Sequence, residues 1–208
     1  VLPSGLSTIG SNAFSGCTSL ASIVIPNQVY SIGRYAFSSC SVLTSIAIPP
    51  EVSVISEGMF KECNSLKYIT FQGPISMIGK EVFMGCESLT SISIPYGITS
   101  IEENMFNGCT SLLSIILPNS INKIGSQAFK GCTSLKTNKY DNCVYLGRND
   151  NDYAILIEIS DLQTPSTVIH KDVELLCDEV FKDYTELTSV MLPTIAIPFV
   201  SKSNLKTV

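Results

Sequence analysis

The chain has 208 residues, of which 45% are hydrophobic, and a formal net charge of −5 at pH 7. This length and composition suffice for the core of one elongated domain. The acidic balance disfavours nucleic acid and anionic membranes as partners, since both require clustered lysine and arginine. No apolar run approaches the roughly 18–20 residues of a membrane span, so we expect no direct membrane insertion by this chain.

The dominant feature of the sequence is a pattern that occurs six times at an interval of 23 residues. Each copy has a phenylalanine, a cysteine three residues later and a leucine three residues after that. The cysteines are Cys17, Cys40, Cys63, Cys86, Cys109 and Cys132. A fixed period of this length is typical of a solenoid, in which each repeat forms one coil and contacts only its neighbours. One coil buries too little apolar surface to offset the entropy of ordering it, so the coils must stack.

Within a coil, the first segment predicts a strand, because Ile23 and Ile25 lie two residues apart and Pro26 then ends the strand. Further on, apolar residues at i, i+4, i+5 and i+8 indicate a short helix or 3₁₀ turn. In the second coil these residues are Ile32, Ala36, Phe37 and Cys40. Glycines before four of the cysteines suit the end of such a turn, where φ is positive. They are Gly16, Gly85, Gly108 and Gly131. We therefore predict an α/β-type repeat solenoid with a parallel sheet on one face and short helical turns on the other.

Residues 20–40 carry the pattern LxxIxIPxxVxxIGxxAFxxC at every fixed position. This pattern resembles the BspA-like, or Treponema-type, leucine-rich repeat. The resemblance covers residues 1–137 and resumes at about residues 173–193. It implies a leucine-rich repeat solenoid on a bacterial or protozoan surface protein, with adhesion to host or matrix proteins as its function.

The in-phase cysteines predict a buried column of free thiols. Side chains in one column of a parallel stack point the same way and repeat at about 4.8 Å, whereas a disulfide requires Cβ atoms about 3.8 Å apart that lean toward each other. The spacing also differs from the paired Cys-x₂₋₄-Cys of a zinc site. Cys143 and Cys177 lie out of phase, and whether they pair stays open.

The repeat breaks after Leu135, and two apolar segments follow. Residues 143–146 and 153–159 predict the strands of a β-hairpin around the polar segment 147–152. The hairpin strand 153–159 has apolar side chains at alternate positions, so we expect one face of the hairpin to pack on the solenoid. Residues 167–169 then return to the strand register, and the repeat resumes in phase.

Four segments are therefore predicted. They are six 23-residue coils at 1–137 with the first truncated, a hairpin insertion at 138–170, a seventh coil at 171–193, and a linker with the start of a further coil at 194–208. Both ends resemble interrupted coils, which indicates a fragment of a longer protein.

The side chains that point outward from the predicted strands are small and nearly uncharged. They either let the sheet lie flat or form a smooth platform for another protein, and the hairpin offers a second exposed surface. The predicted protein-binding residues are Ser22, Val24, Ser45, Ala47, Tyr68, Thr70, Ser91, Ser93, Ser114, Ile116, Tyr145, Arg148, Asp150 and Asp152.

Few residues suggest chemistry. His170 is the sole histidine, and no recognisable nucleophile motif surrounds it. Residues 149–152 alternate oxygen ligands as calcium loops do, but they lack the glycine and the closing glutamate of an EF-hand, so a hairpin turn is favoured. No phosphate-binding loop or nucleophile elbow is present in the sequence. We expect no catalysis, no cofactor and no metal.

The sequence therefore predicts a non-catalytic protein-binding module of an extracellular or cell-surface protein. Its partner would be a protein ligand, such as a host extracellular matrix or surface protein. The alternative is a structural spacer that presents another domain. Neither the ligand nor the number of missing coils follows from the sequence.

Overall fold

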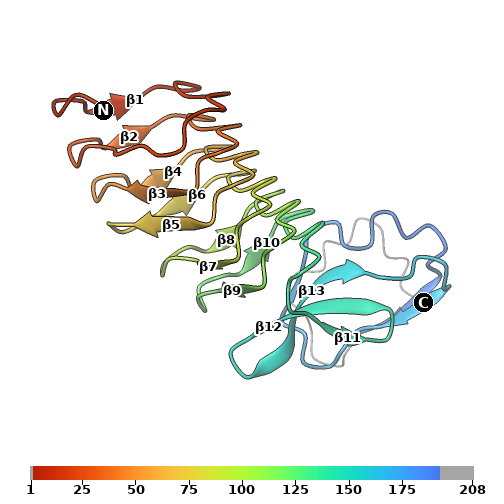
Figure 1. Ribbon diagram of the computed structural model, residues 1–208. Coiled ribbons are helices and arrows are strands. Elements are labelled where there is room, and N and C mark those ends of the chain that lie inside the picture. Colours follow the sequence, from red (N-terminus) through yellow and green to blue (C-terminus); the bar gives the residue numbers. More distant parts are fainter. Residues whose placement is uncertain (1, 193–208) are drawn as a thin grey trace.

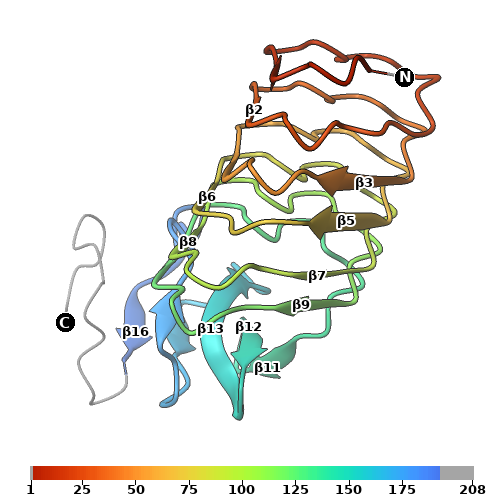
Figure 2. The ribbon, with the colours of Figure 1, turned by 90° about the vertical axis from the view of Figure 1, so that its left-hand side faces the viewer.

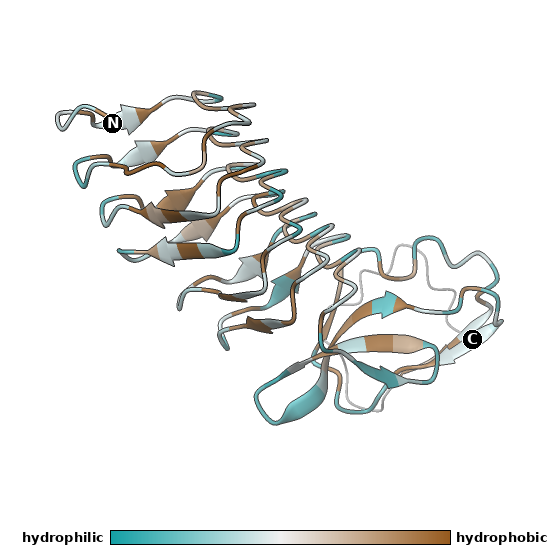
Figure 3. Ribbon diagram, in the orientation of Figure 1, coloured by the Kyte–Doolittle hydropathy of each residue, from teal (hydrophilic) through white to brown (hydrophobic). Residues whose placement is uncertain are grey.

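The computed structural model describes residues 2–192, which form a stack of coils with a broader β-structure at its C-terminal end (Figure 1). No helix occurs in this part of the chain. Successive coils lie one upon another from the N-terminus, as Figure 2 shows from a second direction. Apolar positions return at the same place along successive coils (Figure 3). The predicted solenoid is therefore confirmed.

Each of the coils at 43–65, 66–88, 89–111 and 112–134 carries two short strands instead of the single strand predicted. The first column of strands has the predicted apolar alternation, and it comprises β3 (Ser45–Ile48), β5 (Tyr68–Phe71), β7 (Ser91–Ser93) and β9 (Ser114–Ile116). The second column comprises β1 (Thr8–Ile9), β2 (Ser31–Ile32), β4 (Val54–Ile55), β6 (Met77–Ile78), β8 (Ser100–Ile101) and β10 (Lys123–Ile124). The strands pair in parallel and 23 residues apart, as Ile46 with Ile69 and Val54 with Met77 illustrate. The pairing forms separate two-stranded units, which are β3–β5 and β7–β9 in the first column and β1–β2, β4–β6 and β8–β10 in the second.

The core of the stack consists of columns of identical side chains. The phenylalanine rings from Phe14 to Phe129 stack with neighbouring centroids 5.3 to 6.1 Å apart and planes within 14° of parallel. Each cysteine from Cys40 to Cys132 donates its thiol hydrogen to the phenylalanine carbonyl of the preceding coil, at 3.1 to 3.2 Å. All eight cysteines are free, so the predicted thiol column is confirmed, with Cys40, Cys63, Cys86 and Cys109 buried and Cys132 partly buried. Cys17, in the first coil, is exposed.

The predicted short helices are wrong, because the segment contains interlocking β-turns. In the first coil, the amide of Ala13 donates to the Gly10 carbonyl and the amide of Cys17 donates to the Phe14 carbonyl. The third residue of each turn is left-handed, with φ of 58° at Asn12 and 72° at Gly16. Two left-handed residues four positions apart are incompatible with a right-handed helix. The positive φ predicted for the glycines before the cysteines is confirmed.

Alternate amides of these turns donate to the next coil. In the first coil, the amides of Asn12, Phe14 and Gly16 donate to the carbonyls of Arg34, Ala36 and Ser38 at 2.8 to 2.9 Å. We call these three positions the junction amides of a coil. The next coil accepts a hydrogen bond from each of these amides, which keeps the turn segments of neighbouring coils in register.

The second and third coils are joined by a contact between an aromatic ring and a glycine. The ring of Tyr35 occupies the space where a Cβ atom on Gly58 would lie, and Gly58 has φ of 59°. The Tyr35 hydroxyl donates to Glu57 Oε1 at 2.9 Å. The equivalent residues of the other coils all carry side chains, and they are Asn12, Glu81, Asn104 and Gln127.

The predicted hairpin is confirmed, with β12 (Cys143–Arg148) antiparallel to β13 (Asn151–Ile159). These strands form a four-stranded sheet with β11 (Asn138–Tyr140) on one edge and β15 (Leu175–Leu176) on the other. Separately, β14 (Ser166–Val168) pairs in parallel with β16 (Ser189–Met191), in a register of 23 residues. The repeat therefore resumes in phase, as predicted.

Both faces of the hairpin are covered, whereas the alternation of β13 predicted one. Ile155 and Ile157 pack on the core of the coil stack, while Tyr153 and Ile159 pack in a second apolar cluster on the other side. Irregular register along β12 and β13 changes the direction of side chains between these two clusters. The predicted linker and further coil at 194–208 lie outside the described residues.

Candidate binding surfaces

The predicted outward positions of the first strand column form one exposed surface. Tyr68 lies beside Ser45, and Ile116 lies beside Ser93, on adjacent paired strands. We call this surface the sheet face. Its residues are all exposed, and they are Ser22, Val24, Ser45, Ala47, Tyr68, Thr70, Ser91, Ser93, Ser114 and Ile116. None of them carries a charge, so the sheet face lacks the charged side chains that normally cover exposed strands.

The sheet face also exposes large apolar side chains. Val24 is 83% exposed, Ile116 is 67% exposed and Tyr68 is 63% exposed. Tyr68 and Ile116 lie on β5 and β9, whose inward residues are half-buried in the stack, so these two side chains are held on rigid backbone. The segment around Val24, which was predicted as a strand, forms none. Such an arrangement can bury apolar area against a partner with little reorganisation.

Tyr145 was predicted to bind a partner, and this prediction is wrong. Its side chain is completely buried, and its hydroxyl accepts a hydrogen bond from the His170 amide at 3.0 Å. Burial raises the pKa of Tyr145. Tyr145 lies two residues after Cys143 on the same face of β12, and both side chains pack in the second apolar cluster.

The hairpin turn is fastened to the coils instead of projecting freely. Arg148 donates to the Ile121 carbonyl at 2.9 Å and forms an ion pair with Glu174, and its side chain is only 12% exposed. Burial opposes ionisation of Glu174, but hydrogen bonds from Asn151 and Arg148 outweigh it and lower the pKa. The predicted residues Asp150 and Asp152 are exposed.

The second strand column provides an apolar surface that sequence reasoning missed. Met77 is 52% exposed and lies beside Val54, which is 38% exposed, and Tyr30 in the coil before is 60% exposed. The only signal was the isoleucine that recurs with one residue before it, as in Val54-Ile55 and Met77-Ile78, which the expectation of a helix concealed.

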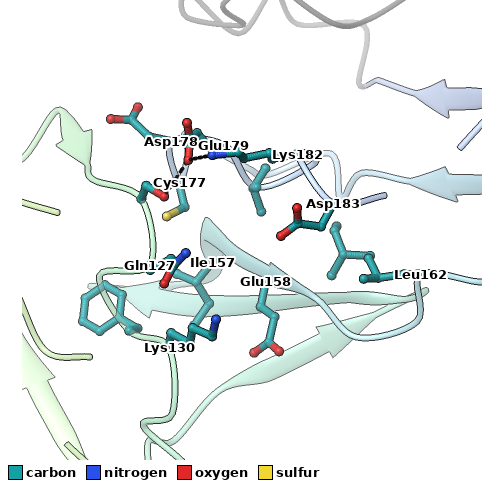
Figure 4. Close-up of a pocket in the computed structure, with 14 residues that line it drawn as sticks. Gln127, Lys130, Ile157, Glu158, Leu162, Cys177, Asp178, Glu179, Lys182 and Asp183 are labelled. Carbon is teal, nitrogen blue, oxygen red and sulfur yellow. Dashed lines mark hydrogen bonds and ion pairs between the residues drawn. The ribbon is translucent and has the colours of Figure 1, made fainter. Parts of the chain in front are cut away.

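A cavity of about 270 Å³ lies where the seventh coil leaves the sixth (Figure 4). Its apolar lining comes from coil six, β13, the segment after β13 and the seventh coil, and comprises Phe129, Ile157, Ile159, Leu162 and Val180. The charged lining is more acidic than basic, and comprises Lys130, Glu158, Asp178, Glu179, Lys182 and Asp183. Lys182 is paired with Glu179 at 3.1 Å, and Asp178 with Lys123 at 3.6 Å. No feature of the sequence indicated this cavity, because it depends on the angle between two coils.

His170 has a packing role in the structure. Its ring stacks on Tyr153 with centroids 3.8 Å apart, and its Nδ1 accepts a hydrogen bond from the Asp172 amide at 3.2 Å. Within residues 2–192, no three side chains of the metal-binding types gather into a cluster. No helix in that range is long and apolar enough to cross a membrane.

Comparison with known families gives one match. The family described as "BspA type Leucine rich repeat region (6 copies)" matches residues 1–111 and 76–194, which is nearly the whole chain. Repeats of this kind generally serve protein interaction, and no enzymatic family is indicated. No curated protein matches the sequence closely.

Several solved structures have a similar fold. A leucine-rich repeat protein from Bacteroides ovatus is 26% identical with a TM-score of 0.65, over 92% of this chain and 53% of that one. A leucine-rich repeat protein from Eubacterium ventriosum is 29% identical with a TM-score of 0.58, over 73% of this chain and 40% of that one. A leucine-rich cell surface protein from Faecalibacterium prausnitzii shares the fold at 22% identity and a TM-score of 0.57, over 90% of this chain and 65% of that one. This chain thus spans 40% to 65% of the length of these three proteins.

Proposed function

Because the chain belongs to the family of BspA-type leucine-rich repeat proteins, we propose that it is a non-catalytic protein-binding module of a cell-surface or secreted protein. Its sheet face adheres to host or extracellular matrix proteins. The observation that carries this proposal is the row of exposed, uncharged strand positions in register across successive coils. The name of the Faecalibacterium prausnitzii protein, a cell surface protein, supports the location.

The physical case rests on exposed apolar area held in fixed geometry. Tyr68 and Ile116 each leave more than 60% of their surface in water on a sheet with no charged side chain among its outward positions. Aromatic and aliphatic side chains of this kind are the ones that contribute most when an interface excludes water. The small serines between them let a partner approach the backbone closely.

Substitutions on the sheet face test the proposal. We expect Ser93→Arg and Tyr68→Ala to weaken capture of purified extracellular matrix proteins (collagen, fibronectin and laminin), because one blocks the face and the other removes an anchor. Truncation of a central anchor typically costs about 2 kcal/mol or more, which is over tenfold in Kd. Thr18→Arg, an exposed position in a turn, is the matched control. Equal capture by all three variants would contradict the sheet face as the binding surface.

The continuous phenylalanine column also suits the alternative, a structural spacer. Stacked rings from Phe14 to Phe129 make each coil rigid with respect to the next. A spacer would bind none of the matrix proteins, would tolerate every sheet-face substitution, and would keep its elongated shape in small-angle X-ray scattering.

A further inference from the structure

The junction amides of coil six differ from those of the five coils before it. In coil five, the amides of Asn104, Phe106 and Gly108 donate to carbonyls of coil six at 2.8 to 3.1 Å, and all four earlier junctions repeat this pattern. The equivalent amides of coil six belong to Gln127, Phe129 and Gly131. The amides of Phe129 and Gly131 donate to no acceptor within residues 2–192, whereas the amide of Gln127 faces the sulfur of Cys177. Backbone amides that face another segment are normally paired, so this edge lacks the chain that its geometry accommodates.

The hairpin insertion explains why the edge is open. Coil seven is held against coil six at its start, where Cys177 donates its thiol to the Gly125 carbonyl at 3.1 Å and the Asp178 amide donates to the Ile124 carbonyl at 2.8 Å. Beyond this point the two coils separate around the cavity, and Ile157 of β13 lies in its lining (Figure 4). The result is a groove with Ser126, Gln127, Phe129 and Lys130 of coil six in one wall, and Gly131 follows directly after that lining.

We propose that this junction groove binds an extended peptide segment of a protein partner, whose alternate carbonyl oxygens accept hydrogen bonds from the amides of Phe129 and Gly131. This is the edge-addition mode of peptide recognition. The proposal rests on the proposed function only in taking the ligand to be a protein, and it concerns a surface separate from the sheet face.

The coil stack itself defines the peptide that fits. Coil six presents the segment 126–130 to coil five, with carbonyls from Ser126, Ala128 and Lys130 and a small apolar side chain in the middle. In the junction groove, the middle side chain would lie on Phe129 and Ile157.

The charge of the groove selects a basic segment. Glu158 and Asp183 line it and form no ion pair within the described residues, whereas Lys182 is already paired with Glu179. Lys130 also lines the groove. A ligand would therefore meet two carboxylates and one ammonium group that are not already paired. A lysine or arginine beside the apolar residue complements this arrangement.

Amide hydrogen exchange on the full 208-residue chain tests the proposal. In the free protein, we expect the amides of Phe129 and Gly131 to exchange faster than those of Phe106 and Gly108, their equivalents in coil five. The probe is the acetylated and amidated peptide Gly-Ser-Gln-Ala-Phe-Lys-Gly, which has the sequence of residues 125–131. An excess of this peptide should slow exchange at Phe129 and Gly131 by about tenfold, which corresponds to one or two hydrogen bonds.

Three results would overturn the proposal. They are equal protection of Phe129 and Phe106 in the free chain, no added protection with the probe, and the same protection with a scrambled peptide of equal composition.

The charge preference is tested separately. Asp183→Asn should weaken binding of the probe peptide by up to about fivefold, the usual range for an exposed ion pair. Glu186→Gln, an exposed acid outside the groove, is the control, and equal binding by both variants would exclude selection for a basic segment. Tyr68→Ala should leave the effect of the probe on amide exchange unchanged. The groove proposal and the sheet-face proposal can therefore fail independently of each other.

Discussion

The thiol of Cys86 donates a hydrogen bond to the carbonyl oxygen of Phe60, 26 residues earlier and 3.2 Å away. The same carbonyl also accepts the amide of Cys63, so it is bonded both within its own turn and to the next coil. A cysteine fits this position because it fills a small apolar space and still donates a weak hydrogen bond. The repeated cysteine is therefore a packing element of the stack.

Cys86→Ala should lower the free energy of unfolding by about 1–2 kcal/mol, because it leaves a small cavity and removes the thiol donor. Urea denaturation in the presence of a reductant measures this. Cys17→Ala is the control, since Cys17 is exposed, and it should change stability by no more than about 0.5 kcal/mol. Similar values for the two variants would contradict a packing role.

The buried thiols also predict a loss of stability at alkaline pH. Burial raises the pKa of Cys63 to about 12 and that of Cys86 well above its ordinary value, while an unfolded cysteine titrates near 8.5. The folded state keeps its protons where the unfolded state loses them. Stability is therefore complete below about pH 8.5 and falls as the pH rises toward the folded pKa.

Above about pH 8.5, each such thiol should lower the free energy of unfolding by about 1.4 kcal/mol per pH unit. Urea denaturation between pH 7.5 and pH 10 should therefore give a shallower decline for Cys86→Ala than for the unmodified chain. Parallel curves for the two proteins would show that burial of Cys86 does not govern its titration.

The glycine of each Ile-Gly pair should be required for stability only where the preceding coil lies against it. A Cβ atom on Gly125 would lie 2.7 Å from the Glu102 carbonyl carbon and 2.9 Å from Glu103 Cα, which are backbone atoms that cannot move aside. We expect Gly125→Ala to cost about 1–3 kcal/mol. Gly10 is the equivalent residue of the first coil and has no such neighbour within 4 Å, so Gly10→Ala should be neutral or slightly stabilising. Thermal denaturation of both variants measures the difference, and equal effects would contradict the close approach.

Arg148 should hold the hairpin against coil six. Arg148→Met keeps the apolar stem but removes the hydrogen bond to the Ile121 carbonyl and the ion pair with Glu174. Loss of a charged hydrogen bond of about 1.5 kcal/mol should speed amide exchange in β12 and β13 by about tenfold. Lys139→Met, at an exposed position of β11, should leave those rates unchanged. Unchanged rates in Arg148→Met would mean that apolar packing alone fixes the hairpin.

The columns of the stack were predictable because their residues repeat at a constant interval. The stacked rings of Phe37 and Phe60 and the thiol column follow directly from that interval. The hairpin was predictable from two apolar segments around a polar turn. In each case, a local pattern is enough to specify the structure.

The turn segments were not predictable in the same way. The spacing of Ile32, Ala36 and Phe37 fits a helix, and the residue that prevents one, Tyr35, is not a glycine although its φ is 55°. The hydrogen bonds from the junction amides to the next coil stabilise this backbone, and they depend on stacking. The burial of Tyr145 and the junction groove likewise depend on how the hairpin packs between two coils, which no local pattern records.

The fit of Tyr35 over Gly58 bears on how the chain finds its native alignment. Stacks of near-identical coils are prone to misassembly in which one coil is skipped, because the columns would still match. Skipping the third coil would bring the Tyr35 ring against Glu81, whose side chain occupies the space that Gly58 leaves empty. The contact between Tyr35 and Gly58 therefore favours the native alignment, because the shifted assembly would produce a steric clash at this position.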